Sequence, residues 1–302
     1  MSTTEKYEVI IIGGSYAGLS AAMALGRSLR KTLLIDSGKP CNQQTPHSHN
    51  FLTQDGKTPS EISAVSKEQV LAYPDVQLIE GLVQEGEKID AGFEVKLGNG
   101  DSYIGKKLIL ATGIQDLIPE IKGFSACWGI SVIHCPYCHG YEFRGKKTGL
   151  MSNGDKAFHM VSLIRNLTDQ VSILPNGKSS FSPEQSQILE KHQIELLEKG
   201  ILEIKHKHGY LKEVLFADGT RQTFDAVYAS IPFRQSKLVE ILGCELTEHG
   251  HIKVNEFQES SVEGIFACGD NSTPLRSVAQ AVASGNFAGA YLNKVLVETE
   301  FT

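Results

Sequence analysis

The chain has 302 residues, and the 41% that are apolar are enough to form the cores of two domains of ordinary size. Its 29 basic and 35 acidic residues give a formal net charge of −6 without any block of lysine or arginine, so nucleic acid is not an expected partner. Residues 1–7 lack the features of a signal peptide, and the apolar run at 9–12 is too short to span a bilayer. We therefore expect a cytoplasmic protein that does not contact a membrane.

The first 36 residues have the pattern of a strand, a tight turn, a helix and a second strand. Residues 7–12 form a buried-strand run, residues 17–29 place Ala, Leu and Met at helical spacing, and residues 31–36 return to a strand. Such a unit predicts parallel strands with a right-handed crossover. Short strands of period two follow between residues 76 and 112, and they indicate a meander that returns to the sheet.

A second copy of this pattern lies further along the chain. Residues 214–219 have their apolar positions and turn glycine at the same offsets as residues 95–100, and an apolar strand follows each. We interpret this as an internal duplication of a nucleotide-binding domain. Segments 114–124 and 231–237 carry Pro, Gly and polar residues, which makes them the candidate crossings between domains.

The predicted fold is therefore α/β, with two Rossmann-like three-layer nucleotide-binding domains, the second inserted into the first. We expect the first domain to be discontinuous, at residues 1–115 and 242–302, and the inserted domain to cover residues 116–241.

A glycine-rich turn lies between the first strand and the first helix, where a dinucleotide fingerprint is expected. Glycines allow a tight turn, and the helix N-terminus offers free N–H groups to a pyrophosphate. Ser15 replaces the usual middle glycine, and Asp36 ends the next strand, where it can accept hydrogen bonds from ribose hydroxyls. The predicted nucleotide-binding residues here are Gly13, Gly14, Ser15, Ala17, Gly18 and Asp36.

Two of the six cysteines lie close together, in the stretch His134-Cys135-Pro136-Tyr137-Cys138-His139. Such a pair can close into a disulfide and reopen by thiolate exchange, which transfers two electrons. The scattered spacing of the other four does not form a disulfide framework, so we expect buried or incidental thiols at Cys41, Cys127, Cys244 and Cys268.

Two other interpretations of this stretch are weaker. Cys135-Pro136-Tyr137-Cys138-His139 formally matches a c-type haem attachment motif, but such attachment normally follows export, and no export signal is recognised. Structural zinc usually needs a second ligand pair spaced well away in sequence, and none is recognisable. We therefore predict no metal site.

A third motif identifies a family. Residues 264–270, a short apolar strand that ends in Gly269-Asp270, together with Leu110-Ala111-Thr112-Gly113, resemble the flavin-binding signatures of the low-molecular-weight thioredoxin reductases and their relatives. The resemblance covers nearly the whole chain and implies FAD as cofactor. It assigns to the flavin the residues Ala111, Thr112, Gly113, Gly269, Asp270 and, on the helix that follows, Ala279.

The resemblance also implies roles at the cysteine pair. Cys138 would face and react with the flavin, while Cys135 would attack an external disulfide. The family usually has an aspartate after the second cysteine, whereas this chain has His139, which titrates near neutral pH and suits an acid/base. The form of the motif is closer to the branch that includes the gliotoxin-type dithiol oxidases. His134 is either a second acid/base candidate or a structural residue.

The inserted domain departs from the family at the expected NAD(P)H site. In the stretch 150–157 only Gly154 and Ala157 survive from the fingerprint, and Ser152 occupies the first glycine position. The segment after the next strand, residues 175–178, offers neither an arginine pair nor an acid for a nicotinamide nucleotide. Use of NAD(P)H is therefore doubtful.

We predict an enzyme, a FAD-dependent thiol–disulfide oxidoreductase similar to thioredoxin reductase, with Cys135 and Cys138 as redox pair and His139 as acid/base. Its partner would be a thioredoxin-like protein or a small dithiol or disulfide, and the resemblance suggests a homodimer. Two alternatives stay open within this chemistry, an oxygen-dependent dithiol oxidase and a reductase fed by a non-nicotinamide donor. A redox-switch binding protein without turnover is an alternative of another class.

Overall fold

The structure is a computed structural model that describes residues 6–302. These residues divide into two compact units. Unit 1 consists of residues 6–43, 51–115 and 233–302, and unit 2 consists of residues 44–50 and 116–232. The chain therefore passes from one unit to the other four times.

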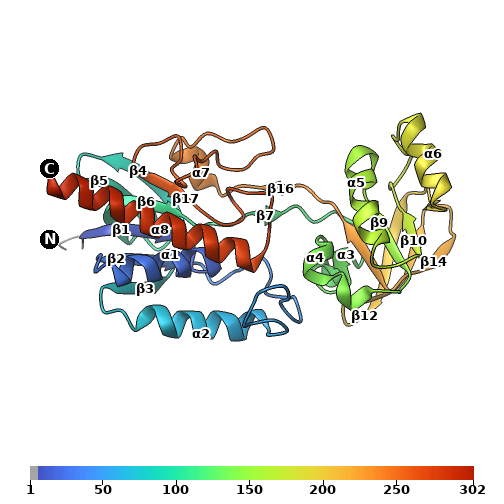
Figure 1. The fold of residues 1–302 in the computed structure, drawn as a ribbon, viewed down its shortest axis with the longest axis horizontal. Coiled ribbons are helices and arrows are strands. Elements are labelled where there is room, and N and C mark those ends of the chain that lie inside the picture. The colour runs from blue at the N-terminus through green and yellow to red at the C-terminus, as the bar shows by residue number, and fades with distance from the viewer. Residues whose placement is uncertain (1–5) are drawn as a thin grey trace. The chain divides into compact units, whose positions relative to one another are not determined.

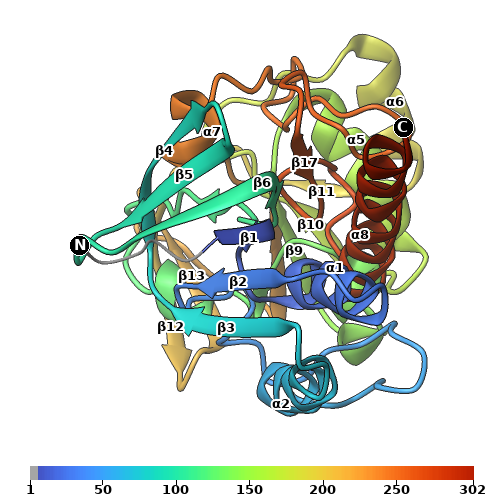
Figure 2. The same cartoon turned by 90° about the vertical axis from the view of Figure 1, so that its left-hand side faces the viewer.

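Unit 1 is built on a seven-stranded sheet. Its main path has the order β3-β2-β1-β6-β5-β4, and β17 pairs in parallel with the second half of β6. The strands β1, β2, β3, β6 and β17 are parallel, whereas β4 and β5 form an antiparallel extension (Figure 2). The bounds are β1 Lys6–Ile12, β2 Thr32–Asp36, β3 Val76–Glu80, β4 Val83–Ile89, β5 Gly92–Leu97, β6 Ser102–Leu110 and β17 Ile265–Ala267.

Strand β1 shows why this sheet has cores on both faces. Val9 and Ile11 belong to one buried cluster and Ile10 and Ile12 to the other, because successive side chains of a strand point to opposite faces. A central parallel strand buried on both sides reads as a continuous apolar run, which is what its sequence shows.

Helices cover one face of this sheet, and a smaller layer covers the other. Helices α1, α2 and α8 contribute to the first cluster, and α7 packs with the β4–β5 extension in the second (Figure 2). The bounds are α1 Tyr16–Arg27, α2 Pro59–Leu71, α7 Lys237–Ile241 and α8 Val278–Phe301. Among residues 6–302, no helix combines the length and the apolarity that crossing a membrane requires.

Unit 2 repeats this plan on a smaller scale. A five-stranded parallel sheet has the order β11-β10-β9-β15-β8, and an antiparallel sheet, β12-β13-β14, packs with α3 against one of its faces. Helices α5 and α6 cover the other face. The strands are β8 Val132–Ile133, β9 Thr148–Met151, β10 Val171–Ile173, β11 Glu195–Leu196, β12 Ile201–Lys207, β13 Tyr210–Phe216, β14 Arg221–Thr223 and β15 Ala226–Ala229.

Unit 2 also contains short and longer helical segments (Figure 1). They are α3 Phe124–Cys127, α4 Pro136–His139, the 3₁₀ helix η1 Tyr141–Phe143, α5 Gly154–Arg165 and α6 Pro183–Lys191. Two further short strands, β7 Gln115–Asp116 and β16 Phe233–Arg234, pair with each other where the chain leaves unit 1 and returns to it.

The predicted fold class is confirmed. The duplication stays a prediction: the two matched segments form β5 and β13, but β5 pairs with β6 in one sheet, whereas β13 and β15 lie in different sheets. The observed division differs from the expected boundaries in two places. Residues 233–241 belong to unit 1, because Leu238 and Val239 of α7 are buried in its second core. Residues 44–50, expected in the first domain, belong to unit 2.

Helices α1 and α8 approach each other at Gly285. A Cβ atom there would overlap the backbone carbonyl of Ala17, so only glycine permits this contact. We expect Gly285→Val to lower the free energy of unfolding by about 1–3 kcal/mol, the usual cost of overpacking, in a urea titration followed by circular dichroism. Ala290→Val, on the exposed face of α8, is the matched control. Equal stability of the two variants would contradict this description of the contact.

Candidate functional site

The glycine-rich turn of unit 1 lies at the carboxyl end of β1. Gly13 has a φ angle of +110°, and a Cβ atom on it would overlap the carbonyl oxygen of Ala111 at the end of β6. Ser15 is the N-cap of α1 but makes no side-chain capping bond, so its side chain satisfies none of the first N–H groups of the helix. The turn therefore presents the start of α1 as a site for an anion.

Asp36 lies beside this turn at the end of β2. Its Oδ1 atom accepts a hydrogen bond of 3.1 Å from the backbone N–H of Gly14, and Lys67 Nζ lies 3.6 Å from its Oδ2 atom. The carboxylate is therefore held beside the glycine-rich turn, and its oxygens have acceptor capacity left.

The two segments of the predicted flavin signature, residues 110–113 after β6 and residues 264–270 around β17, lie next to each other. The buried Asn271 side chain joins them, because its Nδ2 atom donates to the carbonyl of Leu110 at 2.8 Å and to the hydroxyl of Thr112 at 3.2 Å. Gly269 donates its N–H to Ser284 of α8 at 3.0 Å. Asp270 Oδ2 lies 3.5 Å from Arg276 Nε and 3.9 Å from Cys41 Sγ.

The predicted residues of unit 1 thus come together at the carboxyl ends of its parallel strands. They are Gly13, Gly14, Ser15, Ala17, Gly18, Asp36, Ala111, Thr112, Gly113, Gly269 and Asp270, with Ala279 in the first turn of α8. Ligands of open α/β sheets bind at this edge.

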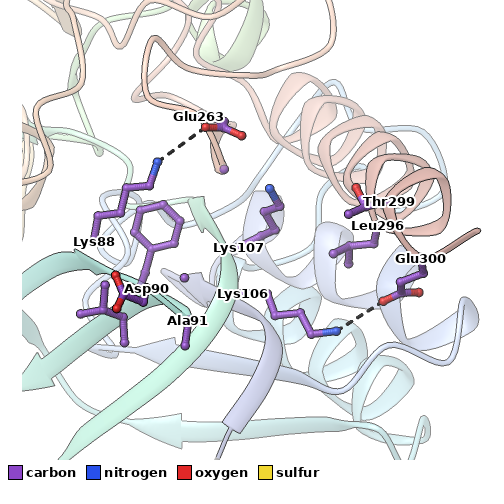
Figure 3. A pocket seen from close by; sticks show the side chains of 13 residues that line it. Lys88, Asp90, Ala91, Lys106, Lys107, Glu263, Leu296, Thr299 and Glu300 are labelled. Atoms are coloured by element: carbon purple, nitrogen blue, oxygen red, sulfur yellow. Dashed lines mark hydrogen bonds and ion pairs between the residues drawn. The ribbon is translucent and has the colours of Figure 1, made fainter. Parts of the chain in front are cut away.

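A different pocket of unit 1, of about 350 Å³, lies around the turn between β4 and β5, the middle of β6 and the end of α8 (Figure 3). Two of its lysines are paired with carboxylates, Lys88 with Glu263 at 3.6 Å and Lys106 with Glu300 at 3.4 Å. None of the predicted site residues lines it.

The cysteine pair lies at the start of α4 in unit 2. Cys135 is the N-cap residue, and its sulfur accepts a hydrogen bond of 3.2 Å from the backbone N–H of Cys138. The two sulfur atoms lie 2.7 Å apart, and both side chains are half-buried. A donor at the Cys135 sulfur stabilises a thiolate there, which is the nucleophile in disulfide exchange.

His139 ends α4 and lines a pocket of about 380 Å³ in unit 2. Burial lowers the pKa of its imidazole below the ordinary value of 6.5; the charge of Glu142 raises it and that of His49 lowers it further. Because the pKa is lowered, the ring is neutral at pH 7 and can accept a proton. His134 instead packs beside Trp128, with ring centroids 6.0 Å apart.

The turn of unit 2 that corresponds to the glycine-rich turn is closed by side chains. Asn153, the N-cap of α5, accepts hydrogen bonds from the backbone N–H groups of Gly154 at 2.8 Å and Ser180 at 2.9 Å. Its amide also donates to the carbonyl of Lys178 at 3.0 Å. One side chain thus joins the start of α5 to the loop after β10, the two places where a dinucleotide would bind.

Comparison with known proteins identifies the family. The family described as pyridine nucleotide-disulphide oxidoreductase matches residues 7–285. The chain belongs to this family.

Individual relatives agree with this assignment. The chain is 34% identical to the protein named thioredoxin reductase tcpT of Claviceps purpurea, over 96% of this chain and 94% of that one. It is 28% identical to the thioredoxin reductase of Bacillus subtilis, over 100% and 98%. Among solved structures, an oxidoreductase from Agrobacterium tumefaciens superposes with a TM-score of 0.91 at 36% identity, covering 97% and 99%. The predicted resemblance and the prediction of a disulfide oxidoreductase enzyme are therefore confirmed.

Family membership implies FAD, and the residues of unit 1 fit it. The uncapped start of α1, the Gly13 turn and the Asp36 carboxylate provide the contacts that a dinucleotide requires. In addition, Oδ1 of Asn271 is buried and has no hydrogen-bond partner among residues 6–302, which leaves an acceptor at the junction of the two signatures. The roles of the individual residues stay predictions.

The family name also implies a pyridine nucleotide, and the residues of unit 2 do not fit one. A pyrophosphate needs the N–H groups at the start of α5, and Asn153 already accepts from the first of them. Gly154 is also close to the loop after β10, since a Cβ atom on it would lie 3.0 Å from Ser180 Oγ.

Several residues of these sites were not singled out from the sequence. Asn271 directly follows the Gly-Asp pair, but only the pairing of β17 with β6 brings it to Thr112. Asn153 lies in the stretch 150–157, but no local pattern indicates that its side chain reaches Ser180. No sequence signal indicates that residues 44–50 bring His49 to within 3.6 Å of Glu142.

We expect Asn271→Leu to lower the free energy of unfolding by about 0.5–1.5 kcal/mol, because it removes one of the two donors to the Leu110 carbonyl and leaves only the N–H of Cys268. A urea titration of the purified protein measures it. Asn286→Leu, at an exposed position on α8, is the control. The bridging role is excluded if both variants unfold at the same urea concentration.

Proposed function

We propose that the protein is a FAD-dependent thiol–disulfide oxidoreductase in which Cys135 and Cys138 exchange with an external dithiol or disulfide. The observation that carries this proposal is the position of the two sulfur atoms, 2.7 Å apart at the start of α4, with His139 on the same short helix. FAD, when bound, supplies a group that accepts or donates an electron pair. The flavin would be held by the residues of unit 1 described above.

The exchange step follows from the geometry of the pair. The Cys135 thiolate, stabilised by the Cys138 N–H, attacks one sulfur of an external disulfide, and the other sulfur leaves as a thiolate. Cys138 then attacks Cys135 in the mixed disulfide, which releases the second thiolate and closes the Cys135–Cys138 bond. The external disulfide is thereby reduced by two electrons, and the pair is oxidised. In the opposite direction, the same steps oxidise a dithiol.

Each of these steps moves a proton. His139 is neutral at pH 7 because burial lowers the pKa of its imidazole, so it can take the proton of an attacking thiol and return it to a departing thiolate. Acidification through the pKa of His139 protonates the ring and removes the base. Activity in the direction that needs the base should therefore fall as the pH decreases.

Replacement of either redox cysteine tests the proposal. We expect Cys135→Ser and Cys138→Ser each to abolish dithiol–disulfide turnover while the yellow flavin stays bound, since both cysteines lie in unit 2 and the predicted flavin residues lie in unit 1. Turnover is measured with free thiol reagents and bound flavin by its visible absorption. Cys244→Ala is the control, because burial raises the pKa of that thiol and makes it unreactive. Unchanged turnover in either serine variant would refute the proposal.

A second candidate within this chemistry is an oxygen-dependent dithiol oxidase, in which a dithiol and O₂ yield a disulfide and hydrogen peroxide. The Asn153 contacts favour it over a reductase fed by NAD(P)H, because they occupy the start of α5. A small redox protein that supplies electrons in place of a nicotinamide is the remaining option.

Anaerobic mixing distinguishes the electron donors. We expect a small dithiol to decolourise the flavin rapidly, and NADPH or NADH at the same concentration to act at least about 100-fold more slowly, since loss of the charge-assisted contacts of a pyrophosphate costs several kcal/mol. The absorbance decrease near the flavin maximum gives the rate in a stopped-flow instrument. Rapid bleaching by either nicotinamide would show that the start of α5 opens, and would favour the reductase.

The partner is proposed from chemistry and from the names of the relatives. Relatives named thioredoxin reductase favour a thioredoxin-like protein, and a small dithiol or disulfide is the other class. Homodimer formation and a cytoplasmic location stay predictions from the sequence. The redox-switch binding protein would need no acid/base beside the pair, so the position of His139 favours an enzyme.

A further inference from the structure

The pocket beside His139 brings together three titratable side chains from two separate parts of the chain. His139 ends α4, Glu142 lies in η1, and His49 comes from the segment 44–50 that belongs to unit 2. All three line the same pocket of about 380 Å³. The proposed function assigns a role to His139 but none to Glu142 or His49.

The backbone between the cysteine pair and Glu142 places His139 and Glu142 on one side. Helix α4 continues through Gly140, whose φ and ψ are −71° and −31°, into η1, so the path from Pro136 to Phe143 is helical. Residues three apart on such a path are neighbours. Gly140 is required here, because a Cβ atom on it would overlap the carbonyl of Pro136 and lie 2.8 Å from the Tyr228 hydroxyl.

The two carboxylate oxygens of Glu142 have different surroundings. Oε1 lies 3.6 Å from Nε2 of His49. Oε2 is buried and has no hydrogen-bond partner among residues 6–302. A buried carboxylate oxygen without a donor is costly, so a donor at this position stabilises the site. The imidazole of His139 lines the same pocket, so a proton on it brings a positive charge into the surroundings of this carboxylate.

The charges around His139 act in opposite directions. The negative charge of Glu142 favours a proton on His139, and the positive charge of His49 disfavours it. The other titratable groups that line the pocket are His47, Lys146, Tyr210, Lys212 and Asp225, and one oxygen of Asp225 accepts from the backbone N–H of Lys147 at 3.2 Å. The pKa of the buried Tyr228 is raised by burial, by Cys135 and by Glu142, so its hydroxyl stays protonated throughout.

We propose that Glu142, held from its other side by His49, is a positioning residue that enables His139 to accept and return the proton of the redox pair. This inference rests on the proposed function. When a thiol of the pair is deprotonated, the proton goes to His139, and the negative charge of Glu142 stabilises the resulting imidazolium. The pair keeps its electrons until the disulfide exchange itself, so the step is a proton transfer without a redox change.

The test is a pH titration of the His139 imidazole by NMR, with the signal assigned by its loss in His139→Asn. Glu142→Gln should move the titration midpoint down by about one pH unit, because a nearby opposite charge is lost. His49→Asn should move it up, because a like charge is lost. Glu190→Gln, an exposed glutamate on α6, is the control and should leave it unchanged. Glu142→Asp keeps the charge, so the titration midpoint of this variant should lie close to that of the parent protein. This result would also show that the position tolerates substitution.

The pH profile of dithiol turnover is recorded on the same variants. Its acidic limb should move in the same directions as the NMR midpoints, and the plateau of Glu142→Gln should fall about tenfold. A structural defect would lower the plateau in both variants without opposite shifts. Midpoints that coincide with the parent protein, or that move in one direction in both variants, would overturn the inference. If Cys135→Ser is still active, the proposed function fails instead, and the NMR result stands separately.

Discussion

At the carboxyl end of β1, three backbone segments approach each other more closely than side chains would allow. The Gly13 turn lies against the carbonyl of Ala111, and Gly285 of α8 lies against the carbonyl of Ala17. This contact fixes the start of α1, the end of β6 and the first turns of α8 relative to one another. Every predicted flavin residue of unit 1 lies on one of these segments or on the neighbouring ends of β2 and β17, so the binding edge depends on it.

The two units use the same topology for different purposes. In unit 1 the first N–H groups of α1 receive no side-chain cap, whereas in unit 2 Asn153 caps α5 and joins it to the loop after β10. A capped helix start is more stable, but the N–H group that the cap occupies, here that of Gly154, is not offered to a ligand. The proposed redox pair and His139 of unit 2 lie at α4, and not at the turn after β9 where a nucleotide fingerprint would act.

The sequence predicted those parts of the fold and site that depend on local pattern. The apolar run at β1, the glycine turn and Asp36 were recognisable because one strand–turn–helix unit contains them. The chain returns to unit 1 at residue 233, whereas residue 242 was expected. Helix α7 is too short to show a clear helical period in the sequence, and its burial depends on contact with the β4–β5 extension. The contacts of Asn153 with Ser180 and of His49 with Glu142 join residues far apart in sequence, and no local pattern specifies such pairs.

The composition of unit 2 affects the order in which the protein can fold during synthesis. Residues 44–50 leave the ribosome well before residues 116–232, yet they form one wall of the pocket that contains His139. Unit 1, by contrast, needs β17 and α8, which are made last. Unit 2 can thus be completed on the ribosome while unit 1 still lacks β17 and α8. A fragment that contains only residues 116–232 would lack residues 44–50, and with them the side of the pocket that carries His49.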